Sequence, residues 1–400
     1  MLRKLLLTSV ITAFALAGKT APVTSEPYSD VKAHIEKEIV FMNKSYKEYG
    51  VSVKNRKVGL DNQSYSLVAS PIVIDKNTSI DSLGLVGLKI NNDMNYTTDG
   101  YNSTMYLTAL PKDMNLTKDE QKLLTHLVKD KTIEVYTNYN IKTKEFKTTL
   151  KDINETTPEA IIKISGINID GLFDIDKPEK QIINLSIGDL NIKAKGAKFK
   201  GEHLNLKNAF IKTESVLNKN SYDVVYKSGM ELLDSNLEGK SLHVEKANID
   251  VKIGNIDAKA YEEISKLAQE NPNIGLEDPK LQALVATVVS NGVFLEIEDL
   301  SAVNIIDNKK AVGGFKINVK LTIDKDPKIA QLISVNPMMA LSALNLDARI
   351  ELSKANYKTI LKTPRGAMLA MLPPKTEKDN FVYTIKYSKS KLIVNGMPLN

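Results

Sequence analysis

The feature that most constrains the fold is a strict alternation of apolar and polar residues in the last third of the chain. Apolar residues occupy every odd position from Phe315 to Ile323 and every even position from Leu344 to Leu352. Successive side chains of a β-strand point to opposite faces, so this period of two gives each strand one apolar and one polar face. The polar face indicates an antiparallel sheet with water on one side.

The same alternation, with more interruptions, recurs from Val51 to Leu150 and from Ile161 to Asp257. Helical spacing is confined to shorter segments, among them residues 31–49 and 258–271. The dipeptides Asp278-Pro279 and Asp326-Pro327 each supply a helix cap followed by a first-turn proline. We predict an α+β fold, in which a long, twisted, largely antiparallel β-sheet carries several helices packed on one face.

The first residues are typical of a secretory signal. Arg3 and Lys4 precede an apolar run from Leu5 to Leu16, and Ala15-Leu16-Ala17 is a small-residue cleavage site. A membrane-spanning helix needs about 20 apolar residues, and this run is shorter. We expect cleavage after Ala17 and a periplasmic location. The alternative is an uncleaved inner-membrane anchor with the body facing the periplasm, and membrane contact is expected only through that segment.

Three segments follow from these patterns. They are a signal peptide at 1–17, a polar leader with an amphipathic helix at 18–50, and a β-rich body at 51–400 with a sub-boundary near 155.

Composition removes several function classes. Cysteine is absent, which excludes disulfides, thiolate metal sites and cysteine nucleophiles. No basic block with stacking aromatics occurs, so we expect no nucleic-acid partner. The histidines lack helical metal-ligand spacing and are interpreted as isolated surface or sheet residues. We therefore expect no catalytic residues, no metal and no cofactor. The four histidines are His34, His126, His203 and His243.

Most of the chain after about Val51 resembles the YdgA-like family of bacterial proteins, a domain-of-unknown-function family, most sharply in its C-terminal third. The resemblance is carried by the ending YTIKYSKSKLIVNGMPLN, by the ordered strands GGFKINVKLTID and LNLDARIELS, and by the unit from ANIDVKIGNIDAKAY to VVSNGVFLEIEDL. The L-x-V-N-G step is matched by Leu392, Val394, Asn395 and Gly396. The resemblance implies a cell-envelope protein with a long β-rich body, and it supplies no catalytic residues.

Two classes of function stay open. The first is a non-catalytic envelope protein whose apolar sheet face contacts a lipid, an acyl chain or an envelope partner, with a purely structural scaffold as its alternative. The second is a periplasmic hydrolase whose catalytic residues are dispersed in the sequence. The candidate apolar face comprises Phe315, Ile317, Val319, Leu321, Ile323, Leu346, Ile350 and Leu352.

Overall fold

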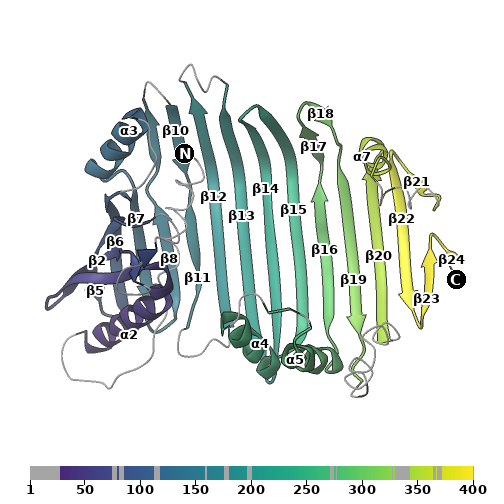
Figure 1. Cartoon of the computed structure of the whole chain (residues 1–400), viewed down its shortest axis with the longest axis horizontal. Coiled ribbons are helices and arrows are strands. Elements are labelled where there is room, and N and C mark those ends of the chain that lie inside the picture. Colours follow the sequence, from purple (N-terminus) through teal and green to yellow (C-terminus); the bar gives the residue numbers. More distant parts are fainter. Residues whose placement is uncertain are drawn as a thin grey trace. The chain divides into compact units, whose positions relative to one another are not determined.

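The computed structural model describes most of the chain, as two compact units, Met1–Gly201 and Glu202–Asn400 (Figure 1). The expected signal peptide at 1–17 lies outside the described residues, as does most of the helix expected after Pro327. The described residues are 28–73, 79–80, 85–111, 118–157, 160–174, 180–195, 201–270, 274–275, 277–326, 328, 343–363, 366 and 372–399.

The first unit is built on an antiparallel sheet in the order β1–β2–β5–β6–β7–β8–β11–β12. Strand β10 continues β11 along β12, and β9 continues β8 beside β10, in the same registers. Strands β9 and β10 pair with each other, so residue 155 lies inside this unit and the division falls at Gly201. The elements are α2 (Ser29–Ser45), η1 (Lys47–Tyr49), β1 (Val51–Val58), β2 (Asn62–Ala69), β3 (Ile72–Val73), β4 (Ser79–Ile80), β5 (Lys89–Thr97), β6 (Gly100–Ala109), α3 (Lys118–Lys129), β7 (Glu134–Asn140), β8 (Glu145–Leu150), β9 (Ile153–Thr156), β10 (Ala160–Ser165), β11 (Asn168–Leu172) and β12 (Lys180–Ala194).

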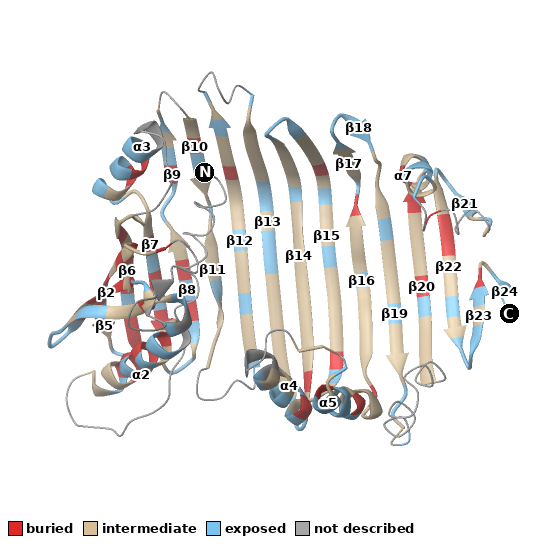
Figure 2. Cartoon of the chain, in the orientation of Figure 1, coloured by how far each residue is buried: buried red, intermediate tan, exposed pale blue. Residues whose placement is uncertain are grey.

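Helix α2 closes the core of the first unit. Its apolar stripe, at the helical spacing seen in the sequence, includes Val31, Ile35 and Met42, all of them buried. These side chains belong to one cluster with residues of β2, β5, β6 and β7. Figure 2 shows buried residues concentrated in the strands around α2. The amphipathic helix expected at 18–50 is therefore part of the first unit.

The second unit is an antiparallel sheet of long strands, in the order β13–β14–β15–β16–β19–β20–β22–β23–β24. Strand β17 continues the pairing of β16 along β15. The elements are β13 (His203–Asn218), β14 (Ser221–Leu237), β15 (Lys240–Asp257), α4 (Ala258–Glu270), α5 (Pro279–Ser290), β16 (Phe294–Ala302), β17 (Asn304–Asp307), β18 (Lys310–Ala311), β19 (Phe315–Ile323), β20 (Leu344–Ser353), α7 (Lys354–Ile360), β21 (Lys375–Glu377), β22 (Asn380–Ser388), β23 (Lys391–Val394) and β24 (Met397–Leu399).

The described helices of the second unit lie against ends of its strands. Helix α5 begins as the sequence predicts, because the Asp278 carboxylate accepts hydrogen bonds from the backbone N–H groups of Lys280 (2.8 Å) and Leu281 (3.0 Å). Helices α4 and α5 contact β15, and α7 contacts β20 and β22. The predicted fold class, an α+β protein dominated by a long antiparallel sheet, is confirmed.

The packing of α2 gives a first prediction. Ile35 on α2 is fully buried, whereas Val40 on the same helix is 59% exposed. We expect Ile35→Ala to lower the free energy of unfolding of the first unit by about 2–5 kcal/mol, because it leaves a cavity under the helix. Val40→Ala, the control, should change it by less than about 0.5 kcal/mol. The free energy of unfolding of each variant would be measured by denaturant titration, with hydrogen exchange of the β5 and β6 amides as the probe. Equal effects would mean that α2 is not part of the core.

Candidate functional site: an apolar face of the second unit

Cross-strand pairing in the second unit aligns apolar side chains into rows that cross many strands. Residues directly opposite each other in an antiparallel pair project from the same face, so each row lies on one face of the sheet. We call this face the apolar face. Its rows, read across the strands, are Ile249, Leu300, Ile317, Ile350 and Tyr383; then Tyr226, Val251, Ile297, Val319, Ala348, Ile385 and Val394; then Val224, Ile253, Leu295, Leu321, Leu346, Tyr387 and Leu392.

Strand β16 contains one residue more than its neighbours β15 and β19 over the same length, and this extra residue keeps the rows aligned. The pairing shifts by one between Ile297 and Leu300 on both sides of the strand, which is the signature of a β-bulge. Asn318 of β19 donates a side-chain hydrogen bond to the backbone carbonyl of Glu298 within the bulge. Without the bulge, the residues beyond it would turn to the other face.

The candidate residues chosen from the sequence are brought together on this face. Phe315 lies opposite Leu352, Ile317 opposite Ile350 and Leu321 opposite Leu346 in the pairing of β19 with β20. Val319 and Ile323 face Ala348 and Leu344 in the same register. All eight candidates therefore share one surface.

Most of the apolar face is neither buried nor fully open. Along β14 and β19 its side chains are of intermediate exposure, and Ile249 on β15 is 37% exposed. Figure 2 shows the same contrast, with few buried residues in the middle of the long strands. From β14 to β19 the apolar side chains of these rows therefore keep some contact with water, which is unusual for a sheet face in a soluble protein. At the other edge of the face Ala348, Leu352, Tyr383 and Val394 are buried, the last three in one hydrophobic cluster.

Two corners of the apolar face are covered by helices. At one end, the ring of Tyr261 on α4 lies 5.7 Å from the ring of Tyr222 on β14. At the diagonally related end, Tyr357 on α7 lies 4.4 Å from Phe381 on β22, measured between ring centroids. The helices thus frame the face at two corners and do not explain the partial exposure of its middle.

The middle of the opposite face carries a network of ion pairs, whereas near the β14–β15 hairpin that face carries an apolar row of Leu206, Leu233, Val244 and Ile305. Exposed pairs of this kind contribute little stability each, but they keep that face hydrated. The pairs are Lys227 with Asp250 (2.6 Å), Lys252 with Glu298, Lys386 with Asp347 (3.4 Å) and Arg349 with Glu377 (2.7 Å).

The L-x-V-N-G step has a structural explanation. Leu392 and Val394 lie on the apolar face, whereas Asn395 (φ 52°) and Gly396 (φ 85°) form the tight turn between β23 and β24. The Asn395 side-chain oxygen accepts hydrogen bonds from the backbone N–H (2.8 Å) and hydroxyl (3.3 Å) of Thr384. The motif thus fixes the end of the sheet, and its residues are needed for the turn whatever the function.

The polar end of the apolar face holds a cluster that the sequence did not reveal. The Asp234 carboxylate lies between two histidines, with Oδ2 3.1 Å from His203 Nε2 and Oδ1 3.3 Å from His243 Nδ1. The other ring nitrogen of His243 lies 3.1 Å from Glu245 Oε1. We call these four residues the histidine–carboxylate cluster. The sequence signal that could have revealed it is the dipeptide Glu238-Gly239. A two-residue hairpin turn at that point places Asp234 opposite His243.

The geometry around His243 determines its charge. Each ring nitrogen faces a carboxylate oxygen, and a neutral imidazole carries only one N–H. Only the imidazolium donates to both, and the hydrogen bond with Glu245 followed by that with Asp234 raises the pKa of His243 above its ordinary value of 6.5. The same hydrogen bond lowers the pKa of Glu245 below 4.5.

A second polar cluster is buried in the first unit. The hydroxyl of Tyr101 donates to both carboxylate oxygens of Glu38 on α2, at 2.9 and 3.0 Å. Burial, and then the charge of Glu38, raises the pKa of Tyr101 well above its ordinary value. His34 on α2 stacks on Tyr139 with ring centroids 4.8 Å apart. These groups orient α2 on the sheet and are at most 6% exposed, so we assign them a structural role.

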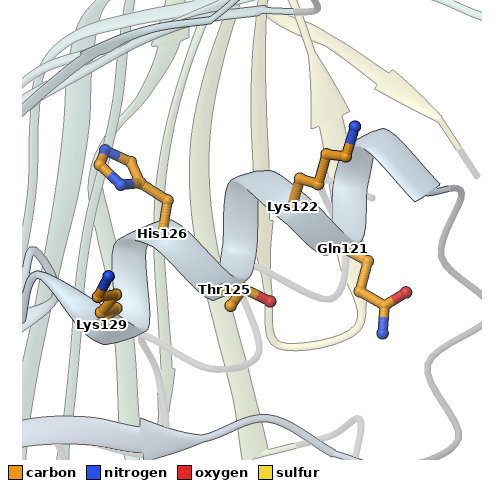
Figure 3. Close-up of a pocket in the computed structure, with 5 residues that line it drawn as sticks. All are labelled: Gln121, Lys122, Thr125, His126 and Lys129. Atoms are coloured by element: carbon orange, nitrogen blue, oxygen red, sulfur yellow. The ribbon is translucent and has the colours of Figure 1, made fainter.

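A shallow hollow lies beside α3. Its lining residues come from a single helix, as Figure 3 shows, and all those whose exposure is described are exposed. His126 is engaged by Asp130 one turn away, at 3.1 Å. Glu155 on β9 approaches the other ring nitrogen of His126, at 3.9 Å. The lining residues are Gln121, Lys122, Thr125, His126 and Lys129.

Comparison with known proteins leaves the residues themselves as the guide to function: no protein-family model and no curated protein matches this chain. Within the described residues, no group of histidines and carboxylates could hold a metal ion. No helix among those residues is long and apolar enough to cross a membrane.

The histidine–carboxylate cluster predicts a pH dependence. Because the folded-state pKa of His243 is raised, its contribution to stability is complete below 6.5 and is lost as the pH rises through the folded value. We expect an NMR titration of His243 to show a midpoint above 6.5, and Glu245→Gln to move that midpoint down. Glu214→Gln, on the opposite face of the sheet, should leave it unchanged. An unmoved midpoint in Glu245→Gln would contradict the bridging geometry.

Proposed function

We propose that the protein is an exported, non-catalytic envelope protein whose apolar face binds the acyl chain of a lipid-like amphiphile. The observation that carries the proposal is the alignment of apolar rows across β14 to β23, which are partly exposed from β14 to β19 and lie opposite rows of ion pairs. Removing such rows from water is favourable at about 25 cal/mol for each Å² of apolar surface. A flexible hydrocarbon chain can provide that contact without strict shape complementarity.

The dimensions of the face support an acyl chain. On β15 the apolar stretch from Ala247 to Ile253 contains six residue steps, or about 20 Å at about 3.3 Å per residue. One leaflet of a bilayer accommodates its chains in about 15 Å, half of the hydrocarbon core. A chain lying along the strands therefore fits between the histidine–carboxylate cluster and the helices at the other end.

The export half of the proposal is supported by the order of the first residues, which is that of a secretory signal. We expect N-terminal sequencing of the protein from the cell that produces it to begin at Gly18. Recovery of an intact Met1 in the membrane fraction would show instead that the segment stays attached as an anchor.

The acyl-chain proposal is tested with two matched isoleucines. Ile249 lies on the apolar face and is 37% exposed, and Ile393, opposite Lys386 on the polar face, is 36% exposed. Both are replaced by aspartate in the full chain. We expect each variant to lose only about 1 kcal/mol of stability, because neither side chain is buried. Native mass spectrometry measures the bound lipid. We expect it to fall at least fivefold in Ile249→Asp and to stay at the wild-type level in Ile393→Asp.

The outcomes separate the alternatives. Lipid carried equally by the wild type and both variants would place the binding elsewhere, and a wild type without lipid would contradict the proposal. Recovery of a protein partner that is lost only in Ile249→Asp would replace the acyl chain with an envelope protein as the ligand of this face.

A further inference from the structure

The histidine–carboxylate cluster lies on the apolar face. On β14, Met230, Leu232 and Asp234 are alternate residues and so project from one side of the strand. Leu232 lies opposite both Lys207 of β13 and Glu245 of β15, which places these two charges in one row. The face is therefore amphipathic along the strands, with aliphatic rows at one end and charged rows at the other.

Apart from His203, which faces Asp234, the charged end carries two groups of each sign. Asp234 and Glu245 each carry one negative charge, and Lys207 and the His243 imidazolium each carry one positive charge. A purely anionic group would meet the two carboxylates, and a purely cationic group would meet the lysine and the imidazolium. What the arrangement complements is a group that itself carries both charges.

The polar side chains at this end can be reached from solvent. The side chains of Asp234, His243 and Glu245 are 40%, 30% and 44% exposed. Asn205, directly opposite Asp234, has a side-chain oxygen that is buried and accepts no hydrogen bond among the described residues. A buried acceptor without a donor is costly, and an N–H donor from a ligand would satisfy it.

We propose that this end of the apolar face binds the head of the amphiphile, and that the head is zwitterionic, with an ammonium group and a phosphate as in a phosphoethanolamine lipid. The ammonium pairs with Asp234 and Glu245 and supplies donors to Asn205, and the phosphate pairs with Lys207. The assignment rests on the proposed function, since the aliphatic rows hold the chain and the charged rows select the head.

The experiment presents the full chain with an equimolar mixture of three lipids that have identical acyl chains and differ in their heads, namely phosphoethanolamine, phosphate and uncharged glycerol. Native mass spectrometry reports which lipid is bound. We expect the phosphoethanolamine lipid to be enriched about fivefold over the other two, since exposed charge pairs contribute modestly. Lys207→Gln and Glu245→Gln should each reduce the enrichment to within about twofold, with binding of the uncharged lipid unchanged.

Two control variants and three further outcomes complete the test. Lys212→Gln and Glu214→Gln remove the same charges from the polar face of β13 and should keep the enrichment. Equal binding of all three lipids would overturn the head assignment and leave the acyl-chain proposal standing, whereas binding of none would overturn the proposed function itself. Free phosphoethanolamine that binds as tightly as the lipid would show that the chain contributes nothing, and this too would overturn the assignment.

Discussion

The second unit depends on one constraint, the antiparallel register that joins its strands. Because side chains alternate along a strand, a shift of one residue would move a whole row to the other face. The register places Val319 between Ile297 and Ala348, and it places Lys320 between Glu296 and Asp347. The apolar face and the charged face are thus two results of the same pairing, and the bulge in β16 preserves both.

The two units use their sheets differently. In the first, α2 lies on the sheet and its apolar stripe is buried, so the sheet face becomes a core. In the second, the described helices contact strand ends, and the middle of the apolar face keeps partial exposure. A sheet held together by its backbone hydrogen bonds and by cross-strand pairs can leave such a face available for a ligand, at the cost of apolar contact with water.

The boundary between the aliphatic and charged parts of the apolar face coincides with a change in backbone geometry. Asn208 on β13 and Lys246 on β15 both adopt positive φ, at 47° and 46°, and they flank Glu231 of β14 in the pairing. Asn208 donates a side-chain hydrogen bond to Glu231 at 2.5 Å. A positive φ raises the conformational energy of a non-glycine residue, and residues in this conformation often mark functional sites. The geometry sets the charged rows apart from the rows that would hold an acyl chain.

The sequence alone determined the strands, their faces and several of their ends. The alternation from Phe315 to Ile323 specified which side chains share a face, Asp278 specified the start of α5, and Asn395-Gly396 specified a turn, because each is a local property of the backbone. Only the tertiary structure decided which strands pair, and therefore that His203 and His243 meet at Asp234. It also decided that the apolar face stays partly exposed, because exposure depends on what packs against a surface and no local pattern encodes that.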